Sequence, residues 1–146
     1  MVKKTWKGVY TPKNPEKYIG DNINNIQYRS NWELQVMLFF DDHPNCIGWG
    51  SEVITIPYKN PLTGKMSRYV PDFLVIYVDR NNEKHVELIE IKPAKESPLY
   101  EGRVNRVTKL YQAINAAKWM AASKFCAQKG WKFKVMTERE LFGSKV

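Results

Sequence analysis

The chain contains few of the residues that mark common metal and redox sites. It has two cysteines, Cys46 and Cys126, two histidines, His43 and His85, and no Cys-x-x-Cys pair. Zinc sites built from cysteine and histidine need four ligands at characteristic spacings, so such a site is not expected. Two isolated thiols suit a reducing compartment, in which we expect both to pack as small core residues.

Long hydrophobic runs and phosphate-binding glycine loops are missing as well. No apolar run is long enough to span a bilayer, and the N-terminus Met-Val-Lys-Lys-Thr-Trp-Lys has no signal-peptide core. No glycine-rich loop ends in Gly-Lys-Ser/Thr, which argues against a P-loop nucleotide hydrolase. We therefore expect a cytoplasmic protein that does not engage a membrane.

Positive charge is abundant in this chain. Its 146 residues include 23 Lys and Arg against 15 Asp and Glu, which gives a formal charge of +8. The length suits one ordinary domain, and a 43% apolar share can fill one core. The basic surplus favours a polyanionic partner, with nucleic acid the leading candidate, although structural and merely soluble basic proteins share this trait.

The chain divides into a basic N-terminal arm, residues 1–28, and a single domain, residues 29–146. The arm is expected to be irregular, and Trp6, Tyr10 and Tyr18 interrupt its polar sequence. Two interpretations stand side by side. The aromatic residues pack the arm over the domain, or the arm runs along a phosphate backbone.

The remaining sequence predicts the element order α, β, β, β, α, β, α. Ser30 and Glu33 form a capping box that opens a helix reaching about Asp41, and Glu33 is in line with the helix's apolar stripe. Thr137 and Glu140 form a second capping box before a short terminal helix. Three strands, 52–58, 66–78 and 85–92, are expected to form an antiparallel meander, and 131–136 joins through a helix crossover, parallel to its neighbour. The crossover helix, 104–128, has a predicted buried stripe of Val107, Leu110, Ile114, Ala117, Ala121 and Phe125.

Charged residues converge at one end of the hairpin formed by the second and third strands. Asp72 lies near the start of one strand, and Glu90 and Lys92 lie at the end of its antiparallel neighbour. Buried charges are costly unless they are paired or bind a metal. The three residues therefore form a salt-bridge cluster, or Asp72, Glu90 and the Ile91 carbonyl hold Mg²⁺ while Lys92 acts as a base or as an electrostatic clamp.

The motif Pro71-Asp72…Glu90-Ile91-Lys92, within an αβββαβ order, resembles that of the PD-(D/E)xK nuclease superfamily. Glu33 matches an additional acidic residue of that superfamily. Longer runs resemble the head-completion nucleases of large tailed phages, and the TnsA transposon-end nuclease domain. TnsA-type proteins carry an additional C-terminal domain, so the phage group is the closer match in length. The matching runs are residues 28–33, 49–52, 56–58, 68–73 and 90–93.

The resemblance implies an α/β fold with a restriction-endonuclease-like core, a mixed four-stranded sheet flanked by helices. It implies a Mg²⁺-dependent endodeoxyribonuclease, with Mn²⁺ as a substitute, acting on double-stranded DNA. The implied catalytic residues are Glu33, Asp72, Glu90 and Lys92, and the implied metal ligands are Asp72, Glu90, Ile91 and Glu33.

The phage group further implies a step late in head assembly, on packaged DNA at the portal end. Portal and head-completion proteins would then be partners, in the cytoplasm of an infected cell or in the virion. Two alternatives stay open: a DNA-binding structural plug that needs no catalysis, and a repair, junction-type or transposon-end nuclease of the same fold. An HNH-type nuclease is not expected, because neither histidine lies in a suitable cluster. The candidate DNA contacts are Arg29, Arg68, Arg103, Arg106, Lys109 and Gln112.

Overall fold

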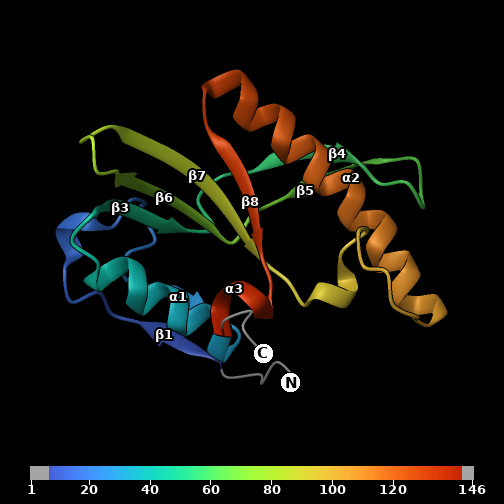
Figure 1. The fold of residues 1–146 in the computed structure, drawn as a ribbon, viewed down its shortest axis with the longest axis horizontal. Coiled ribbons are helices and arrows are strands. Elements are labelled where there is room, and N and C mark those ends of the chain that lie inside the picture. The colour runs from blue at the N-terminus through green and yellow to red at the C-terminus, as the bar shows by residue number, and fades with distance from the viewer. Residues whose placement is uncertain (1–6, 143–146) are drawn as a thin grey trace.

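The computed structural model describes residues 7–142 and is organised around one mixed four-stranded sheet (Figure 1). The strand order is β3-β6-β7-β8, in which the first three strands are antiparallel and β8 runs parallel to β7. This confirms the predicted α/β class and the predicted parallel addition of the last strand. The four strands are β3 (Cys46–Ser51), β6 (Phe73–Val78), β7 (Lys84–Ile91) and β8 (Lys132–Met136).

Helices pack on both faces of this sheet, because side chains of each strand alternate between two apolar clusters. Phe73, Val75 and Ile89 belong to the cluster that also contains α1 (Asn31–Asp42). Leu74 and Leu88 belong to the cluster that also contains α2 (Arg106–Lys129). Within residues 7–142 no helix combines the length and the hydrophobicity that a bilayer crossing requires.

Both predicted helix starts are confirmed, and each shows one hydrogen bond of the capping box. The Ser30 side chain accepts a hydrogen bond from the Glu33 amide at 3.2 Å, and α1 begins at Asn31, directly after Ser30. The Glu140 carboxylate accepts from the Thr137 amide at 2.6 Å at the start of α3 (Glu138–Phe142). The stripe of α1 is also as predicted, since its members Glu33, Val36, Met37 and Phe40 are all buried.

The predicted three-stranded meander is wrong in its first two strands. Segment 52–58 does not enter the central sheet, and segment 66–78 is not one strand. Instead β4 (Ile56–Lys59) and β5 (Met66–Tyr69) pair with each other in a separate two-stranded sheet. The break falls at Val70 and Pro71, because proline has no backbone N–H to donate to a continuing ladder.

The edge place beside β6 belongs to β3, a strand that the sequence did not predict. Gly48 and Gly50 lower its apparent strand propensity. Gly50 is required there, because a Cβ at this position would lie 2.4 Å from the carbonyl oxygen of Ile19. A glycine in a strand interior can thus mark the close approach of another backbone segment.

The long crossover helix is confirmed, with bounds shifted by one or two residues. The Asn105 side chain caps it by accepting from the Thr108 amide at 2.8 Å, and Gly130 ends it at φ 74°. Ile114, Ala117, Ala121 and Phe125 pack against the core but are only partly buried. The buried residues of α2 are Asn115, Ala122 and Cys126. Val107 and Leu110 are 55% and 43% exposed, so their predicted burial is wrong. Figure 1 shows the reason, since the first turns of α2 extend past the sheet.

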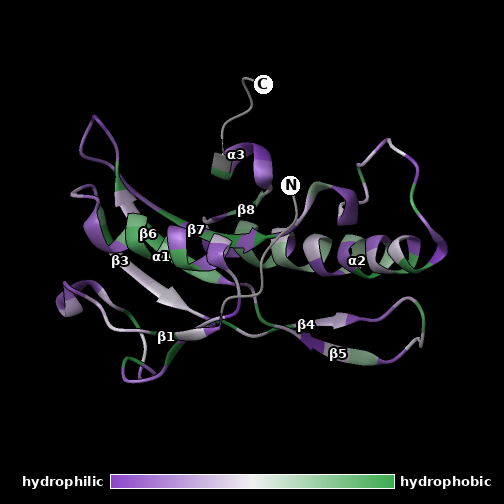
Figure 2. Cartoon of the chain, turned by 90° about the horizontal axis from the view of Figure 1, so that it is seen from below, coloured by the Kyte–Doolittle hydropathy of each residue, from purple (hydrophilic) through white to green (hydrophobic). Residues whose placement is uncertain are grey.

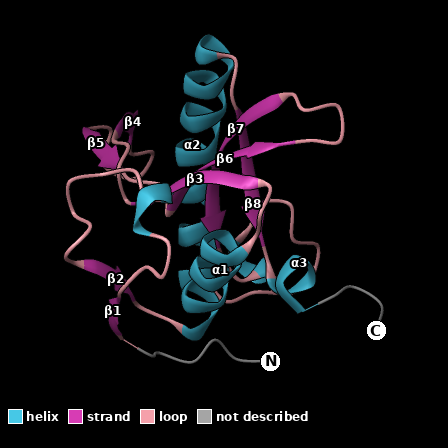
Figure 3. Cartoon of the chain, turned by 90° about the vertical axis from the view of Figure 1, so that its left-hand side faces the viewer, coloured by secondary structure: helices cyan, strands magenta, loops and turns pink. Residues whose placement is uncertain are grey.

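The N-terminal segment was expected to be irregular, and this was wrong for the residues that the structure describes. It contains β1 (Gly8–Tyr10), a 3₁₀ turn (Pro15–Lys17) and β2 (Ile26–Tyr28), and the two strands pair. Tyr10 and Tyr18 are buried in the same cluster as α1, which supports the packing interpretation of this arm. Trp6 lies outside the described residues. Figure 3 shows β1–β2 and β4–β5 on one side of the view and α3 on the other.

Asp41, fully buried at the end of α1, fastens this N-terminal segment to the domain. Its carboxylate accepts from the Tyr10 hydroxyl at 2.5 Å, from the Lys13 amide at 2.7 Å and from the Asn14 amide at 3.1 Å. Burial raises the pKa of Asp41, but these hydrogen bonds outweigh burial and hold the pKa below its ordinary value.

We expect Asp41→Ala to lower the free energy of unfolding by about 3 kcal/mol, because the buried Tyr10 hydroxyl and the partly buried amides of Lys13 and Asn14 lose their acceptor. The carboxylate is stabilised as an anion, so its contribution is present above its unfolded pKa of about 4 and is lost as the pH falls through its lower folded value. Urea titrations at several pH values test this, with exposed Asp42→Ala as the control. Equal stability of the Asp41→Ala variant would contradict the anchoring role.

Candidate active site

The structure brings Asp72 and Glu90 together across the β6–β7 hairpin. Leu74 pairs with Leu88 in the antiparallel register, so Asp72, just before β6, stands opposite Glu90. The Asp72 carboxylate accepts a hydrogen bond from the Ile91 amide at 2.7 Å. The adjacency predicted from the hairpin is therefore confirmed.

Asp72 lies in surroundings that oppose its negative charge. Burial raises the pKa of this carboxyl well above its usual range, and the nearby Glu90 and Glu33 charges raise it further. The Ile91 amide and the Lys92 ammonium act in the opposite direction but do not compensate. Two desolvated like charges at close range disfavour ionisation of both.

Glu90 is 6% exposed and is held by groups on three elements. The Tyr69 hydroxyl donates to its carboxylate at 2.8 Å, and the Lys92 ammonium lies 3.7 Å from the other oxygen. Burial raises the pKa of Glu90, while Lys92, Tyr69 and Lys118 lower it, and the net shift is upward. The site therefore holds two carboxyl groups whose charged forms are disfavoured, with two ammonium groups near them.

Glu33 approaches this pair from α1 but does not join it. Its carboxylate accepts from the Arg29 amide at 3.2 Å and from the Ser30 hydroxyl at 3.4 Å, and its charge acts on Asp72. Across residues 7–142 no three Asp, Glu, His or Cys side chains gather closely enough to share a metal ion. Direct metal ligation by Glu33 thus stays a prediction, and the contacts seen here are those of a capping residue.

The carboxylate pair fits a hard divalent cation. Mg²⁺ is held in many enzymes by one or two carboxylates and keeps several waters, so Asp72 and Glu90 suffice as acidic ligands. Burial raises the pKa of both carboxyls, and a bound cation would favour their charged forms. The carbonyl of Ile91 remains the predicted third donor.

The candidate DNA contacts fall into three groups. Arg29 forms an ion pair with Glu52. Glu52 has a φ of 56°, and its backbone amide donates to the Asp72 carbonyl at 3.0 Å. The Gln112 side chain donates to the Lys95 carbonyl at 2.7 Å, which ties α2 to the segment after β7. The remaining four, all exposed, are Arg68 on β5, Arg103 before α2, and Arg106 and Lys109 on its first turns.

Sequence reasoning missed two residues at this site, Tyr69 and Lys118. Tyr69 directly precedes the Val70-Pro71-Asp72 run, but only the separate β4–β5 sheet turns its hydroxyl toward Glu90. Lys118 is placed by the packing of α2 against β4. The predicted stripe of this helix runs through Ala117 and Ala121, so it does not mark Lys118.

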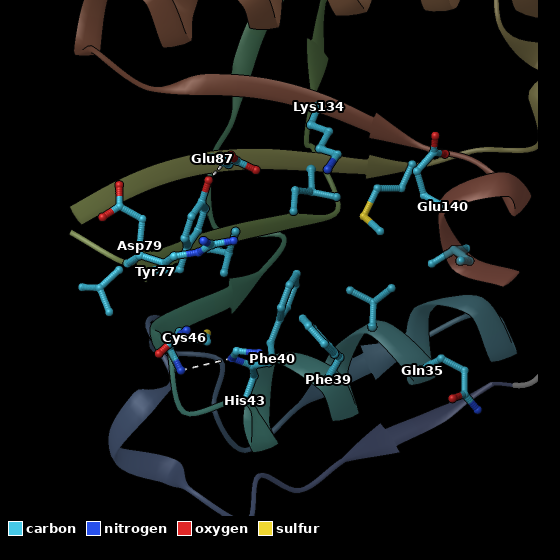
Figure 4. Close-up of a pocket in the computed structure, with 18 residues that line it drawn as sticks. Gln35, Phe39, Phe40, His43, Cys46, Tyr77, Asp79, Glu87, Lys134 and Glu140 are labelled. Atoms are coloured by element: carbon cyan, nitrogen blue, oxygen red, sulfur yellow. Dashed lines mark hydrogen bonds between the residues drawn. The ribbon is translucent and has the colours of Figure 1, made fainter. Parts of the chain in front are cut away.

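One cavity lies away from this site. It has a volume of about 640 Å³ and opens on the α1 face of the sheet, where Tyr77, Glu87 and Lys134 line it (Figure 4). The Tyr77 hydroxyl donates to Glu87 at 2.6 Å within it. Asp72 and Glu90 share the α2 face with Leu74 and Leu88, so this cavity is separate from the carboxylate site.

We expect Asp72→Asn to stabilise the metal-free protein at neutral pH by on the order of 1 to 3 kcal/mol. A carboxyl whose folded pKa is raised contributes fully below its unfolded pKa, about 4, and this contribution is lost as the pH rises through the folded value. The gain from Asp72→Asn should therefore shrink as the pH falls toward 4. Thermal unfolding in chelator, with exposed Asp21→Asn as the control, measures it, and a less stable variant at pH 7 would contradict the repulsion.

Comparison with known proteins identifies the family of this chain. Residues 43–138 match the family model described as TnsA-like endonuclease N terminal. The chain is also 35% identical over 142 residues to the head completion nuclease of Enterobacteria phage T4, with 91% of each chain covered. No solved structure matches the chain. The chain therefore belongs to the TnsA-like endonuclease N-terminal family, as the motif around Asp72 and Glu90 had indicated.

Proposed function

We propose that this endonuclease-family protein hydrolyses phosphodiester bonds of DNA with the help of a divalent cation at Asp72 and Glu90. One observation carries the proposal: the β6–β7 hairpin holds the partly buried Asp72 opposite the buried Glu90, and the Lys92 ammonium lies 3.7 Å from Glu90. Burial raises the pKa of both carboxyls, and the charge of Glu90 raises that of Asp72 further. Such a cluster is unfavourable by itself and becomes favourable when it holds a cation. Family membership supports the same chemistry.

The chain's own groups fix the ligands in place. The Ile91 amide holds one oxygen of Asp72, and the Tyr69 hydroxyl holds one oxygen of Glu90. Asp72, Glu90 and the Ile91 carbonyl would bind Mg²⁺, with Mn²⁺ as a substitute. When bound, the ion polarises the phosphate and lowers the pKa of a bound water.

Lys92 supplies positive charge at the same point. Its ammonium lies beside Glu90, and its backbone amide donates to the Met136 carbonyl at 3.0 Å, so β8 fixes the backbone from which it projects. We propose that it stabilises charge on the phosphate oxygens or orients the attacking water. Glu33 contributes by holding the Arg29 amide and the start of α1.

The biological setting follows from the phage relative. That protein is named a head completion nuclease, and the similarity covers nearly the whole of both chains. We propose that this protein acts on packaged double-stranded DNA at the portal end of a phage head. Portal and head-completion proteins would be its partners, within an infected cell or in the virion.

We expect Mg²⁺ to raise the melting temperature of the wild-type protein and not that of Asp72→Asn or Glu90→Gln. At an ion concentration 100 times the dissociation constant, the stabilisation is about 2.7 kcal/mol. Differential scanning fluorimetry with Mg²⁺ or Mn²⁺ measures the shift. The same shift in all three proteins would place the ion elsewhere.

We expect Asp72→Asn and Lys92→Ala each to reduce Mg²⁺-dependent nicking of supercoiled plasmid by at least about 100-fold, while DNA binding persists. Because Asp72→Asn is expected to fold at least as stably as the wild type, its inactivity cannot be ascribed to unfolding. Lys84→Ala, an exposed lysine at the start of β7, is the matched control and should retain activity.

Two outcomes would count against this function. A wild-type protein that nicks no form of DNA with Mg²⁺ or Mn²⁺ would remove the catalytic proposal. Complementation of a phage lacking this gene by the Asp72→Asn variant would show that catalysis is not needed, and would favour the structural plug. Comparison of branched with linear duplex would separate a junction-type nuclease from the proposed one.

A further inference from the structure

Lys118 occupies a position on α2 where an apolar residue is expected. Ala122 and Cys126, one and two helical turns later, are 0% and 1% exposed and pack against the sheet. A residue four or eight positions before them faces the same way. Lys118 therefore projects toward the hairpin and the sheet, unlike the exposed lysines at positions 109 and 124 of the same helix.

Two tyrosine rings hold the Lys118 side chain. Its ammonium nitrogen lies 5.5 Å from the centroid of the Tyr69 ring and 5.9 Å from that of Tyr58. Both rings come from the β4–β5 hairpin, which lies beside α2 in Figure 2. Aromatic faces attract a cation at these distances, so the rings fix the position of the ammonium.

This ammonium has no anionic partner among the residues that the structure describes. No carboxylate of residues 7–142 lies within 4.0 Å of it, although Glu90 and Asp72 act on it from farther away. Burial lowers the pKa of Lys118, and the like charge of Lys92 lowers it further. An ammonium has three N–H donors, and aromatic faces offer them only weak acceptors. The local electrostatics therefore favour an incoming anion.

One of the two rings that contact Lys118, that of Tyr69, also connects it to the carboxylate pair. Tyr69 presents its ring face to Lys118 and its hydroxyl to Glu90 at 2.8 Å. Tyr69 therefore lies between the Lys118 ammonium and the Glu90 carboxylate and contacts both. Lys92 approaches the same carboxylate from the end of β7, so positive charge reaches the site from two different elements.

We propose that Lys118 binds a phosphate oxygen of the nucleic acid held at the Asp72–Glu90 site, from the α2 side. This inference rests on the proposed function, because it takes the substrate to be a nucleic-acid backbone. The chemistry of recognition is a charge-assisted hydrogen bond from an oriented ammonium to a phosphate. Lys118 is accordingly a substrate-binding residue that sequence motifs do not mark.

The test is DNA binding by Asp72→Asn and by the double variant Asp72→Asn/Lys118→Met, in chelator and over a range of salt concentrations. Methionine keeps the unbranched stem between the rings and removes the charge. We expect binding of a DNA duplex to weaken by about tenfold, and the slope of log affinity against log salt to fall in magnitude by about one. Lys118→Arg should restore both, and Lys124→Met, the same change on the exposed face of α2, should alter neither by as much.

The outcomes separate this inference from the proposed function. Equal affinity and equal salt slope with and without Lys118→Met would overturn it, whatever the cleavage assays show. Weaker binding with an unchanged slope and no rescue by arginine would reduce Lys118 to a packing role and also overturn it. If the wild type cleaves no DNA but Lys118→Met still lowers the salt slope, catalysis fails and the phosphate contact stands.

Discussion

The candidate site is built around the repulsion between the Asp72 and Glu90 carboxylates. The register of the β6–β7 hairpin places these two residues opposite each other. Leu74 opposite Leu88 fixes that register within an apolar cluster, so the two carboxylates cannot separate without a slip of the hairpin. The fold thus uses hydrophobic burial to hold an electrostatically unfavourable pair. Such a pair is expected where a site is arranged for a ligand and not for stability alone.

The β4–β5 hairpin completes the surroundings of the same carboxylate pair. Because Pro71 ends β5 and separates it from β6, the hairpin leaves the central sheet and packs against α2. In this position the Tyr69 hydroxyl donates to Glu90, and the rings of Tyr69 and Tyr58 contact the Lys118 ammonium. A continuous meander would have paired these residues into the central sheet, so the departure from the predicted topology is what completes the surroundings of the carboxylates.

The sequence predicted what local rules determine. The alternation around Asp72 and Glu90, the helix starts at Ser30 and Thr137 and the closing Gly130 are short-range signals, and the structure contains each. It did not predict β3, because the need for Gly50 comes from Ile19, about thirty residues earlier in the chain. Nor did it predict Tyr69 or Lys118 at the site, since both are placed by the packing of one element on another.

Glu33 shows why a motif position and a structural position can coincide. The resemblance assigns it to the metal site, whereas its carboxylate holds the Arg29 amide and the Ser30 hydroxyl at the start of α1. These contacts tie the first turn of α1 to the two residues that precede it. They also fix the charge of Glu33 where it acts on Asp72 and raises its pKa. An acid at this position therefore adds negative charge near Asp72 and Glu90, and this would favour a bound cation even without direct ligation by Glu33.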